Sequence, residues 1–160
     1  MNRLLKQALW NWEESLAVAA LVVMVLSVSF GVVSRYITVT SATWAVELAG
    51  LSFTWAVFLG AAAAFRRNMH VSVDIIVNLL SERANTLLAW VVDLLVLAFL
   101  IYVLYLSVLI SIESHSRPSP VLRISFSYVY LGLVLSMGSM LVHHIRQLVL
   151  KWQNTKESQI

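Results

Sequence analysis

The chain has 160 residues, of which 60% are hydrophobic and 12% are charged. A soluble domain is about half apolar and about a quarter charged. The composition therefore excludes an ordinary soluble protein and indicates an integral membrane protein. It contains no cysteine, which excludes disulfides, cysteine-ligated metals and thiol nucleophiles. The net charge of +3 comes from dispersed Lys and Arg residues rather than from a basic cluster, so the chain lacks the footprint of a nucleic-acid-binding protein.

The first two predicted elements associate with the membrane in different ways. Residues 2–13 have the pattern of an amphipathic helix that lies on the membrane surface. Its apolar face is formed by Leu4, Leu5, Ala8, Leu9 and Trp12. Residues 15–36 are long enough to cross the bilayer, since a span needs about 20 apolar residues. A signal peptide has a shorter apolar run of about 7 to 15 residues, so this segment is interpreted as the first span.

Three further spans follow, over residues 43–65, 86–112 and 125–146. Between the second and third spans, residues 72–85 place apolar side chains at helical spacing, which predicts a second helix on the membrane surface. The alternative for both surface segments is that they extend the neighbouring spans.

Positively charged residues flank the spans unevenly. Eight of the Lys and Arg residues fall on the side of the two chain ends, and three fall on the other side: Arg35, Arg117 and Arg123. Because positively charged segments stay in the cytoplasm, both termini are predicted to be cytoplasmic. The predicted fold class is an all-α integral membrane protein, with residues 1–160 forming a single domain of four transmembrane helices.

Two carboxylates near the spans need an explanation, because a charge inside the bilayer is costly. Glu47 lies near the outer end of the second span, where it either pairs with Arg35 or reaches water separately. Asp93 lies about two turns into the third span and is either a site for a transported proton or cation or has a structural partner. A structural partner, Arg66 or Arg67, is favoured because no second acidic residue lies deep in another span.

Other features of the sequence indicate packing rather than chemistry. Small residues recur every four positions in the second span, at Ser52, Ala56, Gly60 and Ala64, which allows another helix to approach closely. His143 and His144 end the fourth span, but the other two histidines fall in connections on opposite sides, so a bis-histidine haem is disfavoured. We therefore expect no enzyme activity and no cofactor. The proline-containing loop from Glu113 to Arg123 is a candidate docking surface on the outer side.

One block of residues resembles the signature region of a known family, the DctQ-type small membrane subunits of tripartite ATP-independent periplasmic (TRAP) transporters. The resemblance rests on Arg35-Tyr36, Trp44, Glu47, Trp55, Phe58-Leu59-Gly60-Ala61, Arg66, His70 and Val73-Asp74. Length and the number of spans also fit, while the last third of the chain, with its turn at Ser116 to Pro120 and Tyr130, is less distinctive.

The resemblance implies a bacterial inner-membrane subunit that carries no substrate site of its own. In that family a periplasmic binding protein delivers an organic acid, such as sialic acid or a dicarboxylate, to a large membrane subunit driven by sodium. The small subunit supports the large one and helps to dock the binding protein. A second hypothesis is a self-sufficient four-span exporter that acts as a homodimer, but such a protein would carry a mid-span acid in its first helix, and residues 15–34 are uncharged.

Overall fold

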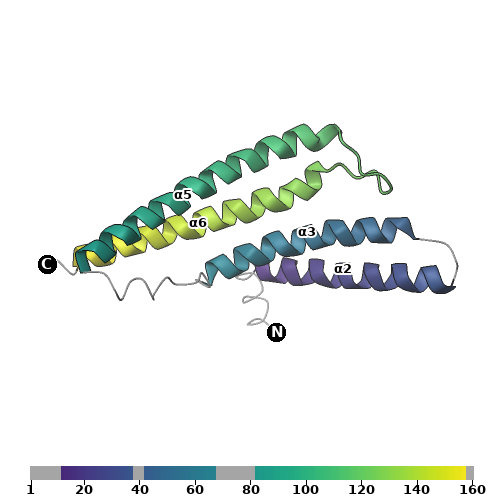
Figure 1. Cartoon of the computed structure of the whole chain (residues 1–160), viewed down its shortest axis with the longest axis horizontal. Helices are drawn as coiled ribbons and strands as arrows, with labels where there is room; N and C mark the ends of the chain where they lie inside the picture. Colours follow the sequence, from purple (N-terminus) through teal and green to yellow (C-terminus); the bar gives the residue numbers. More distant parts are fainter. Residues whose placement is uncertain (1–11, 38–41, 68–81, 158–160) are drawn as a thin grey trace.

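The computed structural model describes residues 12–37, 42–67 and 82–157. These residues form four long helices, labelled as in Figure 1: α2 (Trp12–Ile37), α3 (Thr43–Arg66), α5 (Glu82–Glu113) and α6 (Ser127–Glu157). A short 3-10 helix, η1 (Ser114–Ser116), follows α5. All four long helices are long and apolar enough to cross a membrane, which confirms the predicted class of four-helix membrane protein.

The helices run beyond the predicted spans at several ends because polar residues continue them. Glu13 and Glu14 lie in the first turn of α2 and Arg35 in its last turn, where each charge complements the helix dipole. Helix α6 continues past residue 146, the predicted end of the fourth span, to Glu157. Residues 82–85, predicted to end the second surface helix, form the first turn of α5. The rest of both predicted surface helices, residues 2–11 and 72–81, lies outside the described residues.

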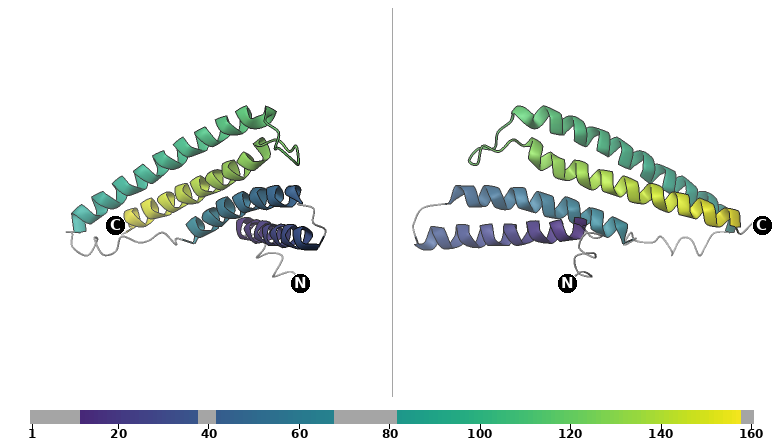
Figure 2. Two further views of the ribbon diagram at one scale, coloured as in Figure 1. Left: turned by 45° about the vertical axis from the view of Figure 1, so that its right-hand side comes forward. Right: turned by 180° about the vertical axis from the view of Figure 1, so that it is seen from behind.

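The helices form two antiparallel hairpins, α2 with α3 and α5 with α6, and the hairpins meet where α3 packs on α6 (Figure 1). The order across the molecule is therefore α2, α3, α6, α5, and the three views agree on it (Figure 2). The four helices thus lie in one layer rather than in a closed bundle, so α2 and α5 are edge helices.

Helix α3 holds most of the small core because it has neighbours on two sides. Five of its buried residues are apolar and small or medium-sized: Ala45, Ala49, Leu59, Ala62 and Ala63. Phe65 and Ala62 join Leu100 of α5 and Met140 of α6 in a cluster between the hairpins. By contrast, large apolar side chains on the edge helices are exposed, as Leu26 is at 63%. These surfaces are suited to lipid or to another membrane chain.

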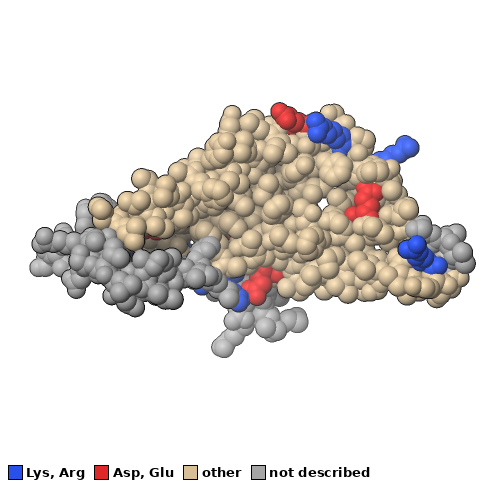
Figure 3. Space-filling model, in the orientation of Figure 1, with Lys and Arg blue, Asp and Glu red and all other residues tan. Residues whose placement is uncertain are grey.

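Charged side chains are confined to patches on the face drawn in Figure 3, and uncharged residues cover most of the remainder. We call the end that carries Arg35, Thr43 and residues 113–127 the outer end, following the predicted orientation, and the opposite end the inner end. The orientation itself stays a prediction from the distribution of Lys and Arg.

Candidate functional site

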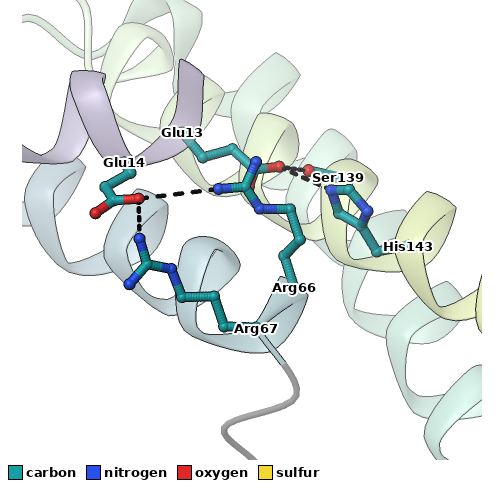
Figure 4. A network of polar contacts seen from close by, with 6 residues as sticks. All are labelled: Glu13, Glu14, Arg66, Arg67, Ser139 and His143. Atoms are coloured by element: carbon teal, nitrogen blue, oxygen red, sulfur yellow. Dashed lines mark hydrogen bonds and ion pairs between the residues drawn. The ribbon is translucent and has the colours of Figure 1, made fainter. Parts of the chain in front are cut away.

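A buried carboxylate joins three helices near the inner end. Glu13, in the first turn of α2, has no solvent-exposed surface. Its Oε1 accepts a hydrogen bond from the Ser139 hydroxyl and lies 3.3 Å from His143 Nε2, both on α6 (Figure 4). Its Oε2 lies 3.7 Å from Arg66 Nε at the end of α3. Because water is excluded, each contact stabilises the carboxylate more than it would at the surface.

A second, more exposed ion pair flanks this carboxylate. Arg67 Nη2 donates to Glu14 Oε2 at 2.5 Å, and Arg66 Nη2 lies 4.0 Å from the same oxygen (Figure 4). We call Glu13, Glu14, Arg66, Arg67, Ser139 and His143 the inner cluster. It fixes the start of α2 and the end of α3 against the middle of α6.

Asp93 has a structural partner, but not the predicted one. Its Oδ2 lies 2.5 Å from Lys151 Nζ, and the Asp93 carbonyl oxygen lies 3.0 Å from Nε2 of His144. The prediction of Arg66 or Arg67 is wrong, since both arginines contact the glutamates of α2. Lys151 lies beyond the predicted end of the fourth span, yet α6 continues far enough for it to reach Asp93.

Of the two alternatives for Glu47, a pair with Arg35 or separate contact with water, the structure excludes the pair and gives the carboxylate a backbone partner. Its Oε2 accepts hydrogen bonds from the backbone N–H groups of Val121, at 2.9 Å, and Leu122, at 3.1 Å. Arg35 is exposed in the last turn of α2 and forms no ion pair with Glu47, so the proposed Arg35–Glu47 pair is not present. Glu47 instead ties α3 to the loop between α5 and α6. We call this contact the outer clamp.

Between the inner cluster and the outer clamp, the hairpins contact through aromatic and small residues. An ideal Cβ on Gly132 of α6 would lie 3.1 Å from Cδ2 of Trp55, so the glycine permits the indole of α3 to pack against the α6 backbone. One turn further, the Ser136 hydroxyl donates to the Phe58 carbonyl oxygen at 2.5 Å. Trp44 packs on Phe30 within the first hairpin, with ring centroids 5.2 Å apart. Trp55 and Trp44 are therefore packing residues here.

The predicted strip of small residues on α3 has an open side. Gly60 and Ala56 line a shallow apolar groove of about 290 Å³ together with Ala17 and Leu21 of α2. An ideal Cβ on Gly60 would meet nothing within 4 Å, so contacts among the described residues do not require glycine there. The predicted close approach of another helix at Gly60 is thus not formed by the described helices.

The remaining predicted site residues, His70 and Asp74, lie outside the described residues. Within the described ranges, no group of three or more His, Cys, Asp or Glu residues could hold a metal ion. The sequence did not point to Ser139, which binds Glu13, or to Lys151, which binds Asp93. Serines and lysines of this kind carry no local signal, because their partners come from distant segments.

Comparison with known proteins places these helices in a transporter family. Residues 24–154 match the family described as Tripartite ATP-independent periplasmic transporters, DctQ component. A protein of Haemophilus influenzae assigned as a TRAP transporter small permease is 28% identical over 126 residues, which cover 79% of this chain and 76% of that protein.

Two other relatives differ in how much of their length is matched. The isethionate TRAP transporter permease protein DctMQ of Oleidesulfovibrio alaskensis is 29% identical over 146 residues, covering 86% of this chain and 23% of that protein. The C4-dicarboxylate TRAP transporter small permease protein DctQ of Vibrio cholerae is 33% identical over 92 residues, covering 58% of this chain and 40% of that protein. A region similar to this chain therefore occurs within a much longer permease chain.

Proposed function

Because the chain belongs to the DctQ family and is a multi-pass membrane component of a TRAP transporter, we propose that it is a static scaffold subunit. In this role it is one four-helix unit of the bacterial inner membrane, with both termini in the cytoplasm. It supports a large membrane subunit that moves an organic acid, such as a dicarboxylate or sialic acid, with sodium. A soluble periplasmic binding protein delivers the substrate.

The observation that carries this proposal is that carboxylates of the described helices bind other segments of the same chain. Glu13, Glu47 and Asp93 each contact a helix or loop of the same chain other than the helix that carries them. A transport path needs polar groups that converge on a solute and release it. These three instead lie at separate places in the fold and hold its segments together. This arrangement favours a brace over a conducting subunit.

The shape of the molecule supports a large membrane partner. A single layer of four helices leaves large apolar side chains exposed on both edge helices. The matched region of the longer DctMQ protein shows that a domain of this kind can be continuous with a larger permease chain. We propose that the separate large subunit covers part of this apolar surface and that lipid covers the rest.

Reconstitution tests the proposal against a self-sufficient exporter. Proteoliposomes are prepared with this chain alone, with the large subunit of the same transporter alone, and with both. Each preparation is supplied with the soluble binding protein and a sodium gradient. Uptake is expected only when both membrane subunits are present. Uptake or export by this chain alone would refute the scaffold role and favour the exporter.

A further inference from the structure

Helix α5 carries a stripe of exposed side chains along its free side. Leu95, Ala98, Tyr102, Tyr105 and Leu109 follow one another at alternating spacings of four and three residues, so they lie on one face of the helix. All five are exposed, with Tyr102 at 62% and Tyr105 at 60%. Helix α5 packs on α6 at the edge of the layer (Figure 2). The stripe therefore faces away from the other described helices.

Both tyrosines lie deep in the membrane-spanning part of α5, which extends over Leu87–Ser116. The two carboxylates of this span, Asp93 and Glu113, are about 30 Å apart along the helix axis, which equals the thickness of the hydrocarbon layer. Tyr102 lies about 14 Å from Asp93 and about 17 Å from Glu113. Tyr105 lies about 18 Å and about 12 Å from the same two residues. Tyrosine in membrane proteins usually lies at the interface instead, where its hydroxyl reaches water.

Neither tyrosine hydroxyl has a hydrogen-bond partner among the described residues. Smaller hydroxyls in the spans bond to their own helix. Thr54 donates to the Gly50 carbonyl oxygen at 3.0 Å, and Ser107 donates to the Val103 carbonyl oxygen at 2.6 Å. A tyrosine hydroxyl is held by its ring away from its own backbone, and an unpaired hydroxyl in lipid is costly. Whatever covers the stripe must therefore offer polar groups at this depth.

The other edge helix, α2, has a different surface at the middle of its span. Val22, Val25 and Leu26 are between 50% and 63% exposed and carry no polar side-chain atom. Ser29 is also exposed, but a serine hydroxyl can bond to a carbonyl oxygen of its own helix, as Thr54 does. Lipid can therefore cover α2 without leaving a polar group unpaired.

We propose that α5, rather than α2, faces the large membrane subunit, and that the hydroxyls of Tyr102 and Tyr105 donate to polar groups of one of its helices. Ala98, one turn before Tyr102 on the same stripe, allows that helix to approach closely. This inference rests on the proposed function, which supplies a membrane chain with polar groups at the required depth. In the DctMQ relative, a region similar to this chain is continuous with a longer permease chain. Lipid and a second copy of this chain are the other possible occupants, and the experiments distinguish them.

The first test maps the neighbours of both edge helices by photo-cross-linking. Benzoylphenylalanine replaces Tyr102, Tyr105 or Leu26, one position at a time, and the complete membrane complex is irradiated in lipid nanodiscs. Leu26 is the matched control, because it is 63% exposed and lies near the middle of α2. The covalent products are identified by mass spectrometry.

Positions 102 and 105 should give adducts between this chain and the large subunit, whereas position 26 should give lipid adducts. Lipid adducts alone from α5, or adducts that join two copies of this chain, overturn the proposal. Large-subunit adducts from position 26 as abundant as those from α5 also overturn it. If the parent chain forms no complex with the large subunit, the proposed function itself fails. A complex that forms without adducts from α5 refutes only the assignment of this helix.

The second test removes the hydroxyls and keeps the rings. The double variant is Tyr102→Phe/Tyr105→Phe, and the control is Tyr128→Phe, at an exposed tyrosine in the first turn of α6 near the outer end. Two interhelical hydrogen bonds in a membrane correspond to about a five- to tenfold change in an equilibrium constant. The large subunit should therefore dissociate about five- to tenfold faster from the purified double variant than from the parent, and the control should match the parent.

Unfolding of the isolated chain in mixed micelles completes this test. The double variant should unfold at the same midpoint as the parent, because neither hydroxyl has a partner among the described residues. An unchanged dissociation rate of the large subunit overturns the role of the hydroxyls. Faster dissociation together with an equally large loss of stability in the isolated chain places their partner within this chain, and also overturns it.

Discussion

Glu13 is the residue whose replacement should perturb the fold most. It is fully buried, and its carboxylate contacts Ser139 and His143 on α6 and Arg66 on α3. Replacing one partner of a buried charged contact costs about 3–5 kcal/mol, because the other charge stays buried without compensation. The Arg66 side chain is 14% exposed and also lies 4.0 Å from Glu14, so the cost should be at the lower end.

We therefore expect Glu13→Ala to lower the free energy of unfolding by about 3 kcal/mol. Glu13→Gln also removes the charge, but it keeps the side-chain volume and an acceptor for Ser139. It should therefore cost less than Glu13→Ala, about 1.5–3 kcal/mol, the value of a hydrogen bond to a charged group. The assay is reversible unfolding of the purified chain in mixed micelles, titrated with a denaturing detergent and followed by tryptophan fluorescence.

Glu14→Gln provides the matched control. Glu14 is the next residue in the same helical turn, but its ion pair with Arg67 is exposed, and such pairs contribute about 1 kcal/mol or less. A double-mutant cycle of Glu13→Gln with His143→Gln should give a coupling of at least about 0.5 kcal/mol, as expected for residues in contact. If Glu13→Gln destabilised the chain no more than Glu14→Gln, and the cycle showed no coupling, the inner cluster would not join the hairpins.

Three further substitutions test the packing and the role of Asp93. Gly132→Ala should lower the free energy of unfolding by about 1–3 kcal/mol in the same titration, because the added Cβ would lie 3.1 Å from the Trp55 ring. An unchanged unfolding midpoint would show that the hairpins do not meet at this position as described. Gly60→Ala should instead stabilise the chain by about 0.5–1 kcal/mol, because the added Cβ meets nothing within 4 Å and alanine favours the helix. A loss of stability would show that the groove beside residue 60 is not open as described. Asp93→Asn breaks the ion pair with Lys151 and should leave uptake by the reconstituted complex within about twofold of the parent, as expected of a partly exposed pair. Loss of uptake with an intact complex would instead assign Asp93 to ion coupling.

The spans could be predicted from the sequence because their signal is local. A helix in lipid must satisfy its own backbone and present apolar side chains, so length and hydropathy are read directly from consecutive residues. The ends were less predictable, because a helix that leaves the bilayer can continue in water. Helix α6 continues past the predicted end of its span to Glu157, and this extension brings Lys151 to Asp93.

The contacts between helices could not be predicted because they join distant residues. Glu13 and His143 are separated by 130 positions, and nothing near either residue indicates the other. The alternative that pairs Glu47 with Arg35 depends only on their closeness in the sequence. The structure instead satisfies Glu47 with two backbone N–H groups, which are present at every residue except proline and so leave no trace in the sequence.

The scaffold role can be tested most directly by locking the first hairpin during transport. An ideal Cβ on Gly31 of α2 would lie 3.7 Å from the Ala45 Cβ of α3, within the range of about 3.5–4.5 Å found across disulfides. The chain has no cysteine of its own, so the double variant Gly31→Cys/Ala45→Cys introduces a unique pair, with each single variant as its control. If the hairpin is a fixed brace, the reconstituted transporter should take up substrate at the same rate when this pair is oxidised and when it is reduced. Uptake that stops on oxidation and returns on reduction would show that α2 and α3 move against each other, and would contradict the scaffold role.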